Sequence, residues 1–148
     1  MVFKFRFQQL LDISLFEEDE IKNRLTAKNA QIAEITAKIN KYEEDYERNI
    51  AERAEEMSKG HFEKFQMYEP YLNVILKSKL FFENELEVQE RQKQKIMTEL
   101  LEKQKTRKTY EILRERDFES FKKEMFKREQ KLLDEFGKKS ILTLDDEQ

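Results

Sequence analysis

Apolar residues recur along the first third of the chain with the spacing of a coiled coil. They follow alternating steps of three and four residues, an average period of about 3.5. Eight of the eleven positions in this row are apolar, and the row is Leu11, Ser14, Glu18, Ile21, Leu25, Lys28, Ile32, Ile35, Ile39, Tyr42 and Tyr46. So narrow a stripe predicts a long helix over residues of about 5–57 that packs against one partner helix.

Glycine and proline indicate where this helix ends. Gly60 is the only glycine before the last dozen residues, and glycine adopts the left-handed conformation that terminates helices. We therefore predict a bend over residues 58–62. Pro70 lacks an amide proton and biases Glu69 away from helix, so it either starts a helix or kinks one. The expectation is a short helix over residues 61–69, a second long helix over about 70–137 and a tail over 138–148.

The second long segment continues the apolar row less well. Only seven of the fourteen row positions from Ile75 to Phe121 are apolar. Polar residues in such a row fix the register of the two helices at a cost in stability. The predicted fold is therefore all-α, a single elongated domain over residues 1–148. It is a long antiparallel two-helix coiled-coil hairpin, loosely packed, with a short helical segment or kink near the bend.

Composition removes several classes of function. The 148 residues are 41% charged, with two glycines, one proline, no cysteine and one histidine. Disulfides, thiolate nucleophiles and zinc clusters are thereby excluded. Two helices side by side enclose no cavity that would shift the pKa of a carboxyl group for catalysis. We expect no enzyme activity, no metal site and no cofactor.

Charge and hydropathy bear on location. The 29 basic and 32 acidic residues give a net charge of -3, which provides no strong attraction to nucleic acid or to an anionic membrane. No apolar run approaches the roughly 18 residues of a membrane span. Gln8, Gln9 and Asp12 interrupt any signal-peptide core. The expected location is the cytoplasm.

The two helices differ in length. Folding back at Gly60 brings the chain start near residue 115, so the residues beyond would lack a partner in the same chain. An apolar surface of that kind requires a cover, and its residues are Phe118, Phe121, Met125, Phe126, Leu132, Leu133 and Phe136. From Arg91 to Lys131 there are 14 basic and 8 acidic residues. This excess indicates either a solvated helix face or a basic rod end inserted among acidic loops of a partner.

Aromatic residues gather at both ends of the predicted hairpin. Phe3, Phe5 and Phe7 alternate as in a strand, yet Phe3 and Phe7 also fit a helix face; we favour the start of the coiled coil over a sticky terminus. A second group surrounds the bend: Tyr42, Tyr46, Tyr68, Tyr71, Ile75 and Phe82. It is either a broadened core or a docking surface. His61, beside Gly60, is interpreted as a helix-end residue.

Three stretches carry a resemblance to a known family. They are Phe5-Arg6-Phe7-Gln8-Gln9-Leu10-Leu11-Asp12, Lys108-Thr109-Tyr110-Glu111-Ile112-Leu113-Arg114-Glu115-Arg116 and Glu129-Gln130-Lys131-Leu132-Leu133-Asp134-Glu135. Because these three stretches occur in this order in a chain of this length and two-helix layout, the chain resembles the FliJ family of flagellar type III export proteins. Members are small cytoplasmic coiled-coil components of the flagellar export ATPase complex. Phe7 stands where leucine is common, and Pro70 departs from the family pattern.

The resemblance implies a non-enzymatic stalk, monomeric when free. Its end with both termini would enter the hexameric flagellar export ATPase, and its other end would reach the export gate, a membrane protein with a cytoplasmic domain. Export chaperones are further implied partners. The stalk would be associated with the membrane through the apparatus, without inserting into it. The implied gate-facing residues are Tyr42, Tyr46, Tyr71, Ile75, Ser78 and Phe82. The residues expected at the ATPase ring are Arg107, Lys108, Leu113, Arg114, Phe118, Phe121, Met125 and Leu132.

Other functions fit the same pattern. The stalk of a virulence type III secretion system shares the architecture, and a coiled-coil holdase chaperone would grip unfolded clients between helical arms. A homodimeric spacer would pair residues 118–136 with their own copy. Nucleic-acid binding rests only on the basic flank of the second helix and is not expected.

Overall fold

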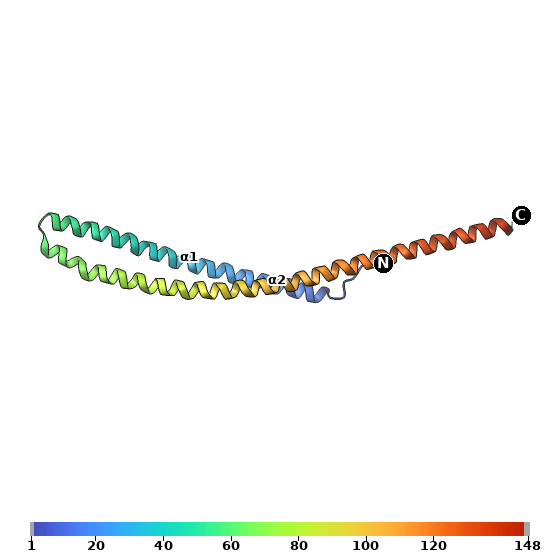
Figure 1. Ribbon diagram of the computed structural model, residues 1–148, viewed down its shortest axis with the longest axis horizontal. Helices are drawn as coiled ribbons and strands as arrows, with labels where there is room; N and C mark the ends of the chain where they lie inside the picture. The colour runs from blue at the N-terminus through green and yellow to red at the C-terminus, as the bar shows by residue number, and fades with distance from the viewer. Residues whose placement is uncertain (1, 147–148) are drawn as a thin grey trace. The chain divides into compact units, whose positions relative to one another are not determined.

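The computed structural model describes residues 2–146 and contains two long helices in that range. Helix α1 spans Gln8–Ser58 and helix α2 spans Phe62–Asp146. No strand is present among the described residues. The all-α helical hairpin predicted from the apolar spacing is thus confirmed (Figure 1).

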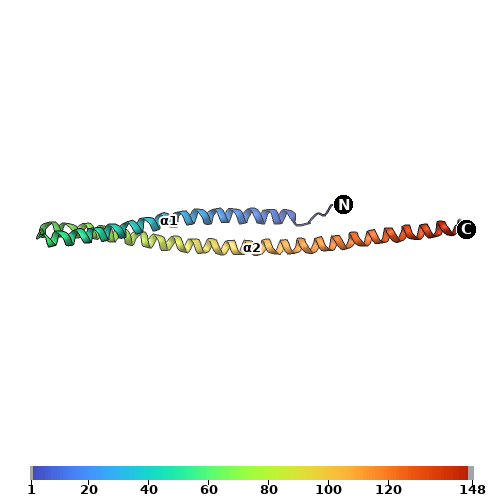
Figure 2. The ribbon, with the colours of Figure 1, turned by 90° about the horizontal axis from the view of Figure 1, so that it is seen from above.

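The chain divides into two compact units. The hairpin unit comprises Asp19–Leu101, and the terminal unit comprises the residues up to Glu18 together with those from Glu102 onward. Within the hairpin unit α1 and α2 lie side by side and run in opposite directions (Figures 1 and 2). The single-domain organisation stays a prediction.

The chain reverses at Gly60, inside the range expected for the bend. Gly60 has a positive φ of 78°. The amide of His61 donates to the carbonyl of Glu56 at 3.0 Å, and the amide of Gly60 donates to that of Met57 at 3.1 Å. These two bonds satisfy carbonyls at the end of α1, as in the Schellman motif. Because the turn needs a left-handed residue, glycine is strongly favoured at this position.

Two of the expected helix boundaries are wrong: the start of the first helix and the break at Pro70. The first helix begins at Gln8 rather than near residue 5, and α2 begins at Phe62 and continues through Pro70 without a separate short helix. A proline removes one backbone hydrogen bond, while Leu72 and Ile75 are buried just beyond it and stabilise the continuing helix.

The tail expected at residues 138–148 is also wrong over most of its length. Helix α2 passes through Gly137 and continues to Asp146, and residues 147–148 lie outside the described range. One glycine costs a helix only about 1 kcal/mol relative to alanine. Gly137 is therefore too weak a breaker to end α2.

The predicted row of α1 forms the contact between the helices. All eleven positions of the row from Leu11 to Tyr46 are buried or half-buried. On α2, the predicted row positions from Ile75 to Phe121 are also buried or half-buried, with the exception of Arg114. The row also includes Asn49, which the pattern missed. This residue is buried, and its side-chain amide donates to the carbonyl of Asp45 at 2.6 Å.

The segment before α1 is neither strand nor helix. Residues 2–7 precede α1 without regular structure, and Phe5 is buried in the terminal unit. The ring of Phe3 lies 5.2 Å from that of Phe118 and 5.5 Å from that of Phe121. The expectation that these phenylalanines start the coiled coil is therefore wrong for Phe3, which packs on α2 from an irregular segment. The carbonyl of Phe7 accepts from the amide of Leu11 at 3.0 Å, so Phe7 does stand at the start of α1. In the same unit α2 extends past the N-terminal segment (Figures 1 and 2).

The two glycines predict opposite effects of alanine. Gly60→Ala should destabilise the protein by about 1 kcal/mol, because a left-handed backbone strains any residue with a Cβ atom. Gly137→Ala should raise the helix content, because alanine is the better helix former and nothing lies within 4 Å of the added Cβ. Urea unfolding followed by circular dichroism measures both changes. Equal unfolding midpoints for Gly60→Ala and the natural protein would contradict the assignment of the turn.

Candidate partner-binding surfaces

The residues expected to face the export gate divide into a covered and an open part. Within the hairpin unit the ring of Tyr42 stacks on that of Phe82, with centroids 5.8 Å apart and an interplanar angle of 21°. Ile75 is 4% exposed. Tyr46 and Ser78 are half-buried, whereas Tyr71 is 51% exposed. The hairpin core thus uses most of this set, and Tyr71 is its most accessible member.

Polar contacts join the helices around this aromatic group. The Tyr68 hydroxyl donates to Glu52 at 3.4 Å, and burial together with the charge of Glu52 raises the pKa of Tyr68. The ammonium of Lys79 lies 3.2 Å from Glu43, and its hydrogen bond to this carboxylate raises the pKa of Lys79. These contacts support the broadened-core interpretation for the covered residues.

One expected ring-contacting residue is already engaged within the chain. In the terminal unit Nε of Arg107 lies 2.6 Å from Oε2 of Glu18, and Nη1 lies 2.9 Å from Oε1 of Glu111. Hydrogen bonds to Glu111 and then Glu18 raise the pKa of Arg107. The side chain of Glu18 is only 3% exposed, so Arg107 neutralises a charge that water barely reaches.

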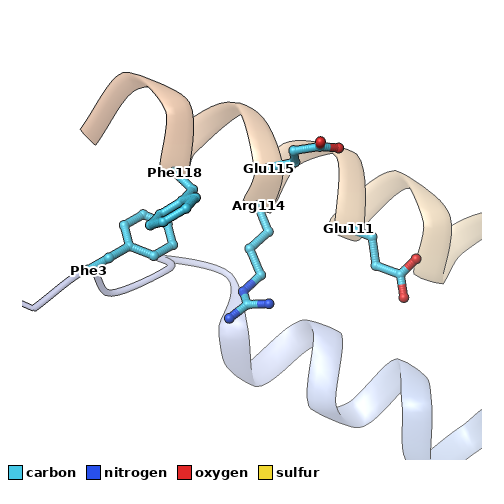
Figure 3. Close-up of a pocket in the computed structure, with 5 residues that line it drawn as sticks. All are labelled: Phe3, Glu111, Arg114, Glu115 and Phe118. Atoms are coloured by element: carbon cyan, nitrogen blue, oxygen red, sulfur yellow. The ribbon is translucent and has the colours of Figure 1, made fainter. Parts of the chain in front are cut away.

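Two expected phenylalanines are partly covered. Phe3 packs against Phe118 and Phe121, and Arg6 lies 3.5 Å from Asp117. A shallow pocket of about 320 Å³ remains beside them, and its lining residues are Phe3, Glu111, Arg114, Glu115 and Phe118. Figure 3 shows the ring of Phe3 against that of Phe118, with the guanidinium of Arg114 pointing away from α2. The N-terminal segment therefore covers part of the surface that was expected to be open from Phe118 onward, while Phe118 itself stays 39% exposed.

The open apolar surface of the terminal unit lies further along α2. Of the expected ring-contacting residues, Lys108 and Arg114 are exposed, Leu113 and Met125 are half-buried, and Leu132 is 54% exposed. The exposed apolar residues beyond Met125, which we call the α2 tip, are Phe126, Leu132, Leu133, Phe136, Ile141 and Leu142. Sequence reasoning missed Ile141 and Leu142, because it assigned them to a tail. Their apolar type within a continuing helix was the available signal.

The described residues form neither a cluster of metal ligands nor a membrane-spanning helix. Among them, no group of three or more histidine, aspartate or glutamate side chains is arranged to hold a metal ion. No helix within residues 2–146 is both long and apolar enough to cross a membrane.

Comparison with known proteins identifies the family. The fold and the exposed helical surfaces define an all-α coiled-coil hairpin protein. The family model described as "Flagellar FliJ protein" matches residues 3–142, so the chain belongs to the flagellar FliJ family. It is thus a coiled-coil protein of flagellar type III export, from a family of non-catalytic flagellar proteins. Searches among curated proteins and among solved structures returned no match.

The polar positions of the helix contact predict two opposite effects on stability. The Ser14 hydroxyl is buried without a hydrogen-bond partner among the described residues, so Ser14→Ala should stabilise the protein by about 1 kcal/mol. Glu18→Gln removes the carboxylate that pairs with Arg107 and should lower the melting temperature.

Glu17→Gln is the matched control for the second change. Glu17 lies 2.5 Å from Lys103, yet its side chain is 42% exposed, so water screens this pair. Differential scanning calorimetry should give a smaller loss for Glu17→Gln than for Glu18→Gln. The reverse order would contradict the role assigned to burial.

Proposed function

We propose that this protein is the non-enzymatic stalk of the flagellar export ATPase complex. The α2 tip inserts into the hexameric ATPase ring, and the end of the hairpin near Gly60 binds the cytoplasmic domain of the export gate. Export chaperones bind along the same coiled coil. The stalk resides at the cytoplasmic face of the membrane through these partners. Membership of the FliJ family supports a place in the flagellar export apparatus. The surfaces described above support the assignment of the α2 tip to the ring and of the Gly60 end to the gate.

The main observation in favour of ring insertion is that α2 extends beyond the N-terminal segment. Exposed apolar side chains recur over residues 126–142 of the terminal unit, and water disfavours an apolar surface that no protein covers. Basic residues follow the same segment, with Lys122, Lys123 and Lys127 bordering Phe126. A ring with an apolar lining and acidic loops would cover both the apolar face and the positive charges.

The mechanism follows from contact between one shaft and several subunits. A single helix cannot present the same face to six subunits, so each subunit meets different side chains. Contacts that differ between nucleotide states would couple ATP hydrolysis to the position of the shaft. We infer that this asymmetry promotes ring assembly and links the ATPase cycle to the gate.

The ring proposal predicts a loss of binding from charges placed on the apolar face of the α2 tip. Leu132→Glu combined with Phe136→Glu should weaken binding to the purified flagellar export ATPase by at least about tenfold, because both side chains would be buried in the ring. Gln130→Glu adds one negative charge on the side of α2 away from Leu132 and Phe136, and should weaken binding by less than the double variant does. Surface plasmon resonance measures the affinities, and circular dichroism checks the helix content. An unchanged affinity of the double variant would refute the ring proposal.

The gate proposal makes a different prediction for neighbouring positions. Tyr71→Ala should weaken binding to the soluble domain of the gate protein while leaving the melting temperature nearly unchanged, because Tyr71 is exposed. Ile75→Ala should instead destabilise the hairpin by about 2 kcal/mol or more, because Ile75 is buried between the helices. Calorimetry and a binding titration separate the two effects. Full gate binding by Tyr71→Ala would argue against this surface.

A further inference from the structure

A second row of apolar side chains runs along α2 in the hairpin unit, outside the contact between the helices. Its spacing alternates between four and three residues. The row, which we call the outer stripe, consists of Met67, Tyr71, Val74, Ser78, Phe81, Glu85 and Val88. Its five large apolar members are between 42% and 75% exposed. The hairpin therefore leaves the five large apolar side chains of this row exposed over residues 67–88, whereas Ser78 and Glu85 are half-buried.

The outer stripe is distinct from the row that pairs with α1. Each of its members directly precedes a buried or half-buried position: Val74 precedes the buried Ile75, and Phe81 precedes the half-buried Phe82. Adjacent helix positions differ by about 100° around the axis. The outer stripe thus forms a separate face beside the helix contact. Because its period is about 3.5, the complementary surface is another α-helix and not a strand.

Helix α1 supplies a second wall for such a helix. Near the turn, Asn49 of α1 lines a shallow groove of about 310 Å³ together with Lys64, Met67, Tyr68 and Tyr71 of α2. Further along, the ammonium of Lys38 lies 5.2 Å from the centre of the Phe82 ring. A third helix on the outer stripe would therefore lie between α1 and α2, as in a three-stranded coiled coil.

Charge on the far border of the outer stripe selects the partner. The α2 residues there are Asn73, Lys77, Asn84, Arg91 and Lys95, which include no carboxylate. In the part of the chain that the structure describes, no ion pair is seen for Lys77, and Arg91 pairs only with Glu87 of its own helix. Flanking charges decide which helices pair. A partner helix with acidic flanks is favoured. A second copy would place this basic border against itself.

We propose that the outer stripe is the docking site for an amphipathic helix of a partner protein, with an apolar heptad repeat over about three heptads and acidic flanks. The stripe shares Tyr71 and Ser78 with the gate-facing residues, so the inference rests on the proposed function and names the chemistry of the segment that binds there. Three-helix packing would bury Val74 and Phe81, which the hairpin leaves exposed.

Designed peptides test the site without the gate protein. One probe is a helix of about 21 residues with isoleucine and leucine in the core positions and glutamate at both flanking positions of each heptad. The second probe is identical except for lysine at the flanks. Fluorescence anisotropy with the full chain should give at least about tenfold tighter binding of the glutamate peptide. Equal binding of the two peptides, or none of the glutamate peptide, would overturn the proposal.

Variants of the chain locate the binding. Val74→Glu with Phe81→Glu should weaken glutamate-peptide binding by at least about tenfold. Leu80→Glu is the matched control, because Leu80 is exposed on the same helix but outside the stripe; it should change binding by less than about twofold. Lys77→Glu with Arg91→Glu should reverse the preference toward the lysine peptide. An equal loss for Leu80→Glu would overturn the proposal, as would a dimer of the free chain that Phe81→Glu dissociates in sedimentation.

The same variants separate this inference from the proposed function. If the glutamate peptide binds the stripe while the gate domain binds nowhere on the chain, the gate proposal fails and the docking site stands. If the glutamate peptide does not bind while the gate domain binds equally well to the natural protein and to the Val74→Glu, Phe81→Glu variant, the docking site fails and the gate proposal stands.

Discussion

The structure depends on the narrowness of the contact between its two helices. In each unit α1 and α2 touch along one row of side chains apiece, and a two-helix contact of this kind covers only a fraction of each helix surface. Only seven apolar residues are buried in the described chain. Apolar side chains off the row, such as Phe81 and Phe136, consequently stay in water. A fold with so little interior exposes side chains for contact with other proteins along its length.

The spacing of apolar residues predicted the helix contact closely, because the spacing within each helix decides which side chains face the other helix. The eleven contact positions of α1 from Leu11 to Tyr46 were predicted from steps of three and four residues along the sequence. The breaks were harder to predict, because whether Pro70 or Gly137 ends a helix depends on how its neighbours pack. The path of Phe3 onto Phe118 joins residues far apart in sequence across an irregular segment, and no periodicity encodes such a contact.

The candidate surfaces were predicted by residue type but not by accessibility. Tyr42 and Phe82 carry the aromatic character expected of an anchor, yet they stack on each other. The sequence pattern did not single out Val74 and Phe81 as surface residues, because each lies next to a position of the predicted helix contact. One residue along a helix changes the direction of a side chain by about 100°. The buried face and the proposed docking face of α2 are thus separated by one such rotation, which the sequence pattern does not resolve.

The tight reversal at Gly60 constrains how the length of this chain can vary. With three residues between α1 and α2, an extra residue inside either helix cannot be absorbed at the turn. It would rotate every side chain on one side of the insertion and separate pairs such as Glu18 and Arg107. Lengthening inside the paired stretches would have to come as whole heptads in both helices at once. The end of α2 is free of this rule, so related chains should differ in size mainly there.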